Sequence, residues 1–163
     1  DIFVFASFTA LSFVDIKELS NEQIVEVNGE KWIISKRHKT GVPFQVKLLD
    51  IPLQIIERYK PFQENNLVFP NLNYWSICKR MGKMIKECGI TKKISFHCSR
   101  HGFATLALSK GMPIESVSRI LGHTNIETTQ IYAKITVQKL DNDLTMLGDK
   151  LSKSFGNVKM AGL

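Results

Sequence analysis

The 163-residue sequence has few of the features that mark several large protein classes. It contains only three cysteines, Cys78, Cys88 and Cys98, which are widely spaced and form no Cys-x-x-Cys pair. The sequence therefore predicts neither a disulfide framework nor a zinc knuckle, and a reducing cytoplasm suits it best.

Long apolar runs are also missing. The strongest candidate, residues 2–11, reads IFVFASFTAL and follows an acidic residue, whereas a membrane-spanning helix needs about 20 apolar residues. The same segment lacks the basic region and the cleavage site of a signal peptide. We expect a buried helix here and no membrane partner, and a chain that begins directly with such a helix is expected to be a fragment of something longer.

The sequence has no internal repeat, low-complexity run or obvious linker, so its length predicts a single domain. It has no Gly-x-Ser-x-Gly motif, which argues against acyl transfer. Acidic residues are scarce in the middle of the chain: residues 31–110 hold fifteen Lys and Arg against four Asp and Glu, and the whole chain has a net charge of +7. This balance fits either an electropositive face for nucleic acid or a solvated lysine-rich surface.

Apolar periodicity predicts a mainly α fold with a small three-stranded antiparallel sheet, an α+β domain. Residues 23–50 alternate apolar and polar side chains and are interrupted by tight-turn signals at Asn28-Gly29 and Thr40-Gly41. Helices are expected over residues 2–19, 52–60, 73–89, 97–110, 113–121, 125–135 and 140–153.

Two histidines and an arginine, His97, Arg100 and His101, fall within one and a half helical turns. A zinc site is one interpretation of the i, i+4 histidines. However, a metalloprotease helix has glutamate directly after the first histidine, where this chain has Cys98, and Arg100 would repel a dication. A second interpretation is a DNA-binding helix-turn-helix over residues 113–135.

A third interpretation, phosphodiester cleavage without a metal, accounts for more positions. This chemistry needs a nucleophile, cations on the non-bridging oxygens, an imidazole donor and an acid for the leaving oxygen. Arg100 and His97 can supply the oxyanion clamp and His123 a second imidazole. Tyr132 offers the nucleophilic phenol, and Lys39, at a hairpin tip, can reach a leaving 5′-hydroxyl.

The same residues resemble the catalytic domain of the tyrosine recombinase (phage-type integrase) family. That family shows H-x-x-R-[HK], then L-G-H, then a tyrosine about nine residues on. This chain has His97-Cys98-Ser99-Arg100-His101, Leu121-Gly122-His123 and Tyr132, and Lys39 stands in a Lys-Thr-Gly turn where the family has its catalytic lysine.

The resemblance implies a site-specific DNA recombinase or integrase that acts through a 3′-phosphotyrosyl intermediate, with no metal and no cofactor. It implies double-stranded DNA as partner, a homotetramer on DNA and a monomer when free. Residues 1–163 would be the catalytic domain without the N-terminal core-binding part, and residues 137–163 a tail exchanged between protomers. The expected location is the bacterial cytoplasm, at the nucleoid; the alternative function is a non-catalytic DNA-binding regulator.

One departure from the family concerns the first helix, where T-G-L-R-x-x-E is replaced by Thr9-Ala10-Leu11-Ser12-Phe13-Val14-Asp15. Ser12 stands in the place of the first catalytic arginine, as it does in the similar integrases of Bacteroides-type conjugative or mobilisable elements. One phosphate contact is thereby left unassigned, and Arg37, Lys36 or a basic residue from the missing N-terminal part could supply it. Those two residues are also expected to bind backbone phosphates, Asp15 to position its neighbours and His101 to support the site.

Overall fold

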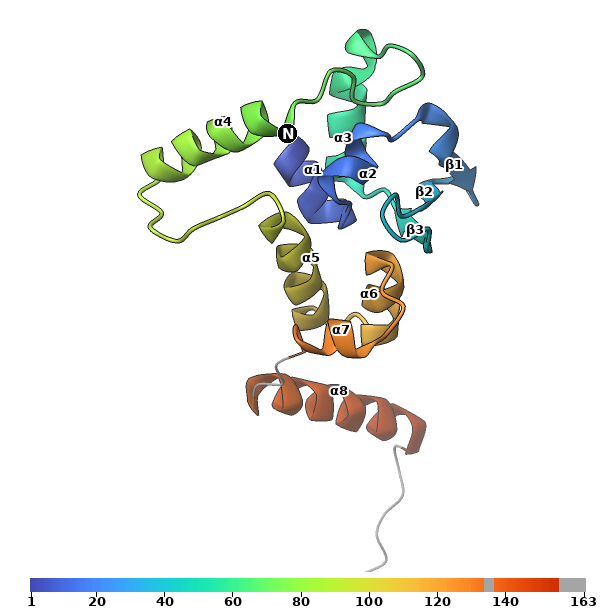
Figure 1. Ribbon diagram of the computed structural model, residues 1–163. Helices are drawn as coiled ribbons and strands as arrows, with labels where there is room; N and C mark the ends of the chain where they lie inside the picture. Colours follow the sequence, from blue (N-terminus) through green and yellow to red (C-terminus); the bar gives the residue numbers. More distant parts are fainter. Residues whose placement is uncertain (134–136, 156–163) are drawn as a thin grey trace, which may run out of the picture. The chain divides into compact units, whose positions relative to one another are not determined.

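The computed structural model describes residues 1–133 and 137–155, and the chain divides into two units, Asp1–Tyr132 and Ala133–Leu163. The first unit carries the sheet and seven of the described α-helices (Figure 1). The second carries α8 (Val137–Phe155). Because no helix of the described residues is both long and apolar enough, none could cross a membrane.

The first unit opens with two short helices, α1 (Ile2–Thr9) and α2 (Phe13–Lys17). The prediction of one helix over residues 2–19 is therefore wrong. Ala10 adopts a left-handed conformation with φ 57°, which ends α1, and Ser12 begins α2 through a capping box with Asp15. The apolar pattern continues across this break because residues on both sides of it are buried.

The predicted three-stranded antiparallel sheet is confirmed, in the order β1 (Ile24–Val27), β2 (Glu30–Lys36) and β3 (Pro43–Lys47). Asn28 and Gly29 both have positive φ values, as the first hairpin turn requires. Ile33 pairs with Val46, and both side chains are buried with Phe44 against the helices. The β2–β3 hairpin thus has one face in the core and its turn in solvent.

The remaining helices of the first unit are α3 (Asp50–Tyr59), α4 (Tyr74–Glu87), α5 (Cys98–Ser109), α6 (Ile114–Leu121) and α7 (Glu127–Gln130). Short 3₁₀ turns lie at Asn21–Gln23 and Lys60–Phe62. Helix α1 packs against α3 and α5, and α6 packs against β3, α5 and α7. The core centres on α1 and includes Phe5, Leu11, Ile16 and Phe69, all essentially inaccessible.

The helix predicted for residues 125–135 is wrong in extent, since α7 covers only four residues. Asn125 accepts a hydrogen bond from the Glu127 N–H, as a residue that starts a helix does. Thr129 is fully buried, and its hydroxyl bonds to a histidine ring. The segment therefore ends as a turn at Tyr132, whose N–H donates to the Thr129 carbonyl.

Helix α8 confirms and extends the helix predicted for residues 140–153. Leu140, Leu144, Leu147 and Leu151 recur at intervals of three or four residues and are all exposed. They form an apolar stripe along one side of the helix.

Candidate active site

Arg100 projects from the first turn of α5 and is anchored at both ends of its guanidinium. Nη1 donates to the Ala10 carbonyl at 2.9 Å, and Nη2 donates to the Leu121 carbonyl. Burial, helped by the charge of Arg37, lowers the pKa of Arg100 to about 10, so the group stays charged at neutral pH. The break after α1 and the end of α6 hold this cation in one orientation.

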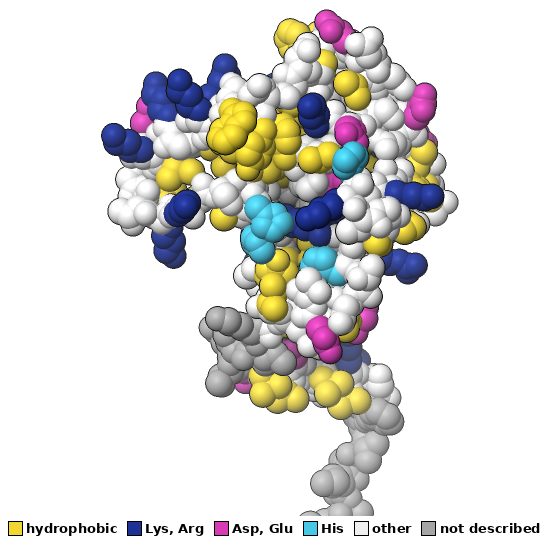
Figure 2. All heavy atoms as spheres, in the orientation of Figure 1, with side chains coloured by type: hydrophobic (Ala, Val, Ile, Leu, Met, Phe, Trp, Pro, Cys, Tyr) yellow, Lys and Arg dark blue, Asp and Glu magenta, His cyan; other side chains and the backbone are white. Residues whose placement is uncertain are grey.

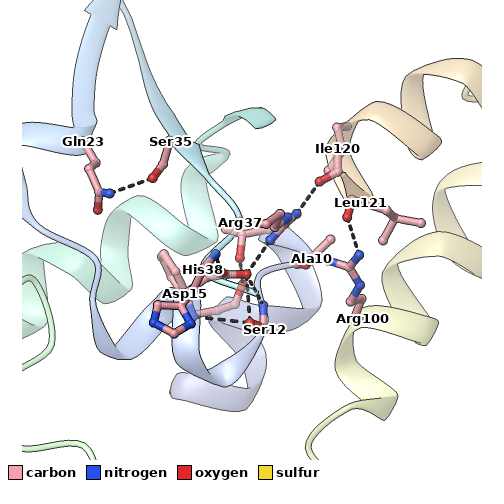
Figure 3. Close-up of polar contacts among 12 residues, drawn as sticks. Ala10, Ser12, Asp15, Gln23, Ser35, Arg37, His38, Arg100, Ile120 and Leu121 are labelled. Carbon is pink, nitrogen blue, oxygen red and sulfur yellow. Dashed lines mark hydrogen bonds and ion pairs between the residues drawn. The ribbon is translucent and has the colours of Figure 1, made fainter. Parts of the chain in front are cut away.

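Arg37, the residue after β2, lies next to Arg100 (Figure 3). Its Nη1 pairs with Asp15 Oδ2 at 2.8 Å, and its Nη2 donates to the Ile120 carbonyl. The guanidinium also lies over the Phe44 ring, 4.0 Å from the centroid. The residue is only 5% exposed, and its buried Nε has no hydrogen-bond partner. Two arginines thus bind consecutive carbonyls at the end of α6.

Asp15 joins the start of α2 to the root of the β2–β3 hairpin. Its carboxylate accepts from the Ser12 hydroxyl at 2.8 Å, from Arg37 at 2.8 Å and from the His38 N–H at 3.1 Å. Burial by itself would raise the pKa of Asp15, but the hydrogen bonds from His38 and Arg37 and the charge of Arg37 outweigh it, so the pKa is lowered. Asp15 is a charged anchor for the hairpin.

Tyr132 places its hydroxyl against α5. The phenol oxygen lies 2.5 Å from His101 Nδ1, and the His101 ring meets the His97 ring edge-on with centroids 4.3 Å apart. Burial raises the pKa of Tyr132, and the charge of Arg100 offsets this only in part. Burial lowers the pKa of His97, and the neighbouring His101 and Arg100 lower it further.

His123 follows the glycine that ends α6. Its Nδ1 lies 2.8 Å from the hydroxyl of Thr129, which fixes the ring and leaves Nε2 as the nitrogen that can meet a ligand. Burial lowers the pKa of His123, and the charges of Arg100 and Arg37 lower it further. At neutral pH, His123 is therefore a neutral imidazole beside two arginines.

The β2–β3 turn carries Lys39 at its tip, exposed to solvent. The turn is closed by backbone hydrogen bonds from Arg37 to Val42 and from Gly41 to Arg37. Lys36, at the end of β2, is also exposed. Neither lysine side chain forms an ion pair within the part of the chain that the structure describes, so both are available to a ligand.

Taken together, these side chains form a cationic site that contains one phenol, the side chain of Tyr132. Figure 2 shows histidine and Lys or Arg side chains close together on one face, beside an apolar patch. No three His, Cys, Asp or Glu side chains of the described residues are arranged to hold a metal ion. An anionic group that accepts hydrogen bonds, such as a phosphodiester, is the ligand that suits this site.

Comparison with known proteins gives the family. Residues 2–139 match the sequence pattern of the phage integrase family. The chain belongs to the phage integrase family. Tyrosine recombinase XerA of Pyrococcus horikoshii is 31% identical over 139 residues, which cover 77% of this chain and 47% of that protein. Tyrosine recombinase XerD of Listeria monocytogenes serotype 4b is 36% identical over 120 residues, covering 69% and 39%. The chain thus spans half or less of these curated relatives.

Solved structures show the tyrosine recombinase catalytic-domain fold. XerH recombinase in a post-cleavage complex with its difH substrate has a TM-score of 0.72 and 23% identity, covering 90% of this chain and 45% of that one. The Tn1549 transposon integrase in complex with a circular intermediate DNA has a TM-score of 0.71 and 17% identity, covering 89% and 57%. The catalytic domain of bacteriophage HP1 integrase has a TM-score of 0.63 and 16% identity, covering 99% and 84%.

The structure brings most of the site residues predicted for this phage integrase family member into one region. His97, Arg100 and His101 share the start of α5, with Tyr132 hydrogen-bonded to His101 and His123 within electrostatic reach of Arg100. The remaining members of the predicted set are distributed as follows: Ser12 and Asp15 lie at the α1–α2 break, and Lys36 and Lys39 on the hairpin.

Two features of the site differ from the sequence interpretation. The sequence groups Arg37 with Lys36 as a contact of backbone phosphates, but the structure buries Arg37 beside Arg100, because Asp15 and the Ile120 carbonyl bind its guanidinium. The sequence interpretation also missed Thr129, the partner of His123. Its only sequence signal is a hydroxyl residue six positions after the histidine.

Proposed function

We propose that this chain is the catalytic domain of a site-specific DNA recombinase that breaks and rejoins DNA through a 3′-phosphotyrosyl intermediate. The observation that carries the proposal is the position of the Tyr132 hydroxyl, 2.5 Å from an imidazole and close enough to Arg100 for that charge to lower its pKa. A half-buried phenol beside fixed cations is suited to attack on a phosphodiester, whose charge grows in the transition state.

Arg100 and the imidazoles of His97 and His123 would stabilise the pentavalent transition state. Arg100 is already oriented by two backbone carbonyls, so no reorganisation is needed when charge develops. His97 and His123 are the neutral donors, because burial and nearby cations lower the pKa of each. Removing one such donor typically costs about 10²–10³ in rate.

Arg37 would supply the cation that Ser12 cannot. The hydroxyl of Ser12 is occupied by Asp15 and caps α2, and it is neutral and short. The Arg37 guanidinium lies in the same cluster, held by the same Asp15, and retains an unpartnered Nε. A second arginine, from the hairpin, thus lies buried beside Arg100, where its positive charge would act on a phosphate bound there, in place of an arginine from the first helix.

Lys39 would protonate the leaving 5′-oxygen. Its turn is tied to the body through Asp15 and His38, while the side chain remains exposed. An ammonium group on such an exposed turn can reach the leaving oxygen of the bound strand and act as a general acid. The reaction stores the energy of the broken phosphodiester in the phosphotyrosine, so religation would need no energy-supplying cofactor. Arg100 and the imidazoles would stabilise charge without a metal.

Double-stranded DNA is the proposed partner. Helix α4 presents Lys79, Arg80, Lys83 and Lys86 to solvent, and Lys36 extends the basic surface on the hairpin. Such exposed cations bind backbone phosphates and position a duplex without reading its sequence.

On DNA we propose a homotetramer that exchanges residues 137–163 between protomers, and a monomer when the protein is free. Of that tail, residues 156–163 lie outside the described residues. The apolar stripe of α8 supports the exchange.

We further propose a role in moving a mobile element of the conjugative or mobilisable type, at the bacterial nucleoid. Two features support it: the serine at position 12, and the structural likeness to the Tn1549 transposon integrase. The alternative of a helix-turn-helix regulator is not favoured, because α7 has only four residues and is too short to serve as a recognition helix.

A covalent trapping experiment tests the proposed function. A labelled duplex with a nick next to the cleavage site loses its short leaving strand, so the protein–DNA adduct accumulates and is seen on a denaturing gel. We expect an adduct with the wild type and none with Tyr132→Phe, which keeps the ring and loses one oxygen. An adduct of equal yield with Tyr132→Phe would refute the assignment.

A further inference from the structure

The contact between Tyr132 and His101 is the shortest described link between the nucleophile and any titratable side chain. The phenol oxygen and His101 Nδ1 are 2.5 Å apart, although the residues are separated by 31 positions and come from α5 and the turn after α7. The two rings are tilted by 52° with centroids 5.4 Å apart, so they meet at their polar atoms instead of stacking. This is the geometry of proton exchange.

A base is needed because the phenol is protonated at neutral pH. Burial raises the pKa of Tyr132. The charge of Arg100 lowers this pKa by less than burial raises it, so the pKa stays above its usual value. A neutral phenol is a weak nucleophile, and enzymes activate such groups with an adjacent base held in place by a third group. His97, packed edge-on against the His101 ring, is positioned to orient it.

Two other candidate acceptors of the site, Asp15 and His123, are committed elsewhere. Asp15 already accepts from Ser12, Arg37 and the His38 backbone. The Nδ1 atom of His123 is bonded to Thr129. Among the described residues, the hydroxyl of Tyr132 has a single hydrogen-bond partner, His101 Nδ1.

We propose that His101 is the general base of DNA cleavage, an inference that rests on the proposed recombinase function. In the active form His101 carries its proton on Nε2, and Nδ1 accepts the phenol hydrogen bond. As the Tyr132 oxygen bonds to phosphorus, its proton moves to Nδ1, the bond from phosphorus to the 5′-oxygen breaks, and that oxygen takes a proton from Lys39. In religation, the 5′-hydroxyl gives its proton back to Lys39 as its oxygen bonds to phosphorus, the bond from phosphorus to the Tyr132 oxygen breaks, and the imidazolium returns its proton to the leaving phenolate.

The experiment varies the base and the acidity of the nucleophile together. His101→Asn retains an oxygen acceptor near the phenol but cannot take up a proton. With nicked duplex in single turnover, we expect cleavage by His101→Asn to fall about 10²- to 10⁴-fold, the usual contribution of a general base. Replacing Tyr132 by 3,5-difluorotyrosine, a more acidic phenol, should recover at least tenfold of that loss in the variant and much less in the wild type.

Two controls separate a base from a merely structural contact. The difluorotyrosine should not rescue Arg100→Ala, whose defect lies in charge stabilisation. A 5′-bridging phosphorothiolate, which needs no acid to leave, should not rescue His101→Asn. Should His101→Asn not fold, His101→Gln takes its place. A loss below threefold, or a loss that the acidic phenol leaves unchanged, would overturn the proposal. Failure of the wild type to form any adduct would instead refute the recombinase function itself.

Discussion

Gly122 satisfies two constraints that no other residue can meet together. Its φ is +64°, in the left-handed region, and a Cβ at this position would lie 2.9 Å from Arg37 Cγ and 3.0 Å from Arg37 Nε. The glycine of the Leu-Gly-His motif therefore ends α6 and also leaves room for the buried arginine. The Leu-Gly-His motif and the β2–β3 hairpin therefore pack directly against each other at Gly122 and Arg37, which are 85 positions apart in the chain.

We predict that Gly122→Ala displaces Arg37 and lowers both stability and cleavage. Gly89→Ala is the matched control, because Gly89 has φ +65° and a methyl group added there would meet no atom within 4 Å. The control bears only the left-handed strain, about 1–2 kcal/mol. Chemical unfolding and single-turnover cleavage of both variants measure the difference. Equal losses in stability and unchanged cleavage would show that the contact with Arg37 is unimportant.

A substrate with a better leaving group distinguishes the proposed acid, Lys39, from the arginines that stabilise charge. We predict slow cleavage of normal DNA by Lys39→Ala and restored cleavage of a 5′-bridging phosphorothiolate, since a thiolate leaves without acid help. Arg100→Ala should stay inactive on both substrates. Rescue of a Lys36 variant, with none for Lys39→Ala, would move the acid to the neighbouring lysine.

At the scale of elements, the break between α1 and α2 places the site. Ala10 offers its carbonyl to Arg100 because the helix stops there, and Ser12 starts the next helix by exchanging hydrogen bonds with Asp15. A continuous helix over residues 2–19 would remove both features. The position where the family has an arginine has become a helix cap in this chain.

Ser12→Ala should therefore be mainly a stability mutation. Loss of an N-cap costs about 0.5–2 kcal/mol, and we predict less than a tenfold loss of cleavage, against near abolition by Arg100→Ala. Ser12→Arg should be tolerated without accelerating cleavage, because Arg37 already occupies the cluster. Single-turnover rates on one substrate decide this. Ser12→Ala as damaging as Arg100→Ala would mean that the hydroxyl acts on the phosphate.

Asp15 links α2 to the hairpin, and its contribution should depend on pH. Because the pKa of the folded carboxyl is lowered, its stabilisation is fully present above the unfolded value near 3.8 and is lost as pH falls through the folded value. Asp15→Asn should cost about 3 kcal/mol at pH 7, since it leaves Arg37 buried without its counter-ion. Unfolding of both proteins at pH 7 and below pH 3 checks this: the gap should shrink in acid. A constant gap would contradict an ionic anchor.

The sequence predicted the elements that depend on local patterns, but not the features that depend on contacts between distant residues. The hairpins followed from Asn28-Gly29 and alternating strands, and the α5 and α6 helices from local periodicity and Gly122. The break at Ala10 could not be predicted, because alanine favours helix and the apolar pattern runs through it. The burial of Arg37 could not either, since its partners lie 22 and 83 positions away. Motif spacing selected the candidate site residues, but only the fold shows which of them are in contact.

At the scale of the whole molecule, a body of residues 1–132 holds the described site, and residues 133–163 form a unit of their own. Tyr132, the proposed nucleophile, is the last residue of this body. This arrangement suits an enzyme whose strand cleavage is coordinated between protomers, as we propose.

The proposed mechanism requires that Tyr132 becomes joined to a DNA 3′-phosphate. Its most direct measurement is mass spectrometry of the trapped adduct after digestion with nuclease and protease. We predict that the modified peptide carries the nucleotide on Tyr132 through a 3′-phosphate, with a free 5′-hydroxyl on the released strand. Linkage to another residue, or to a 5′-phosphate, would contradict the account.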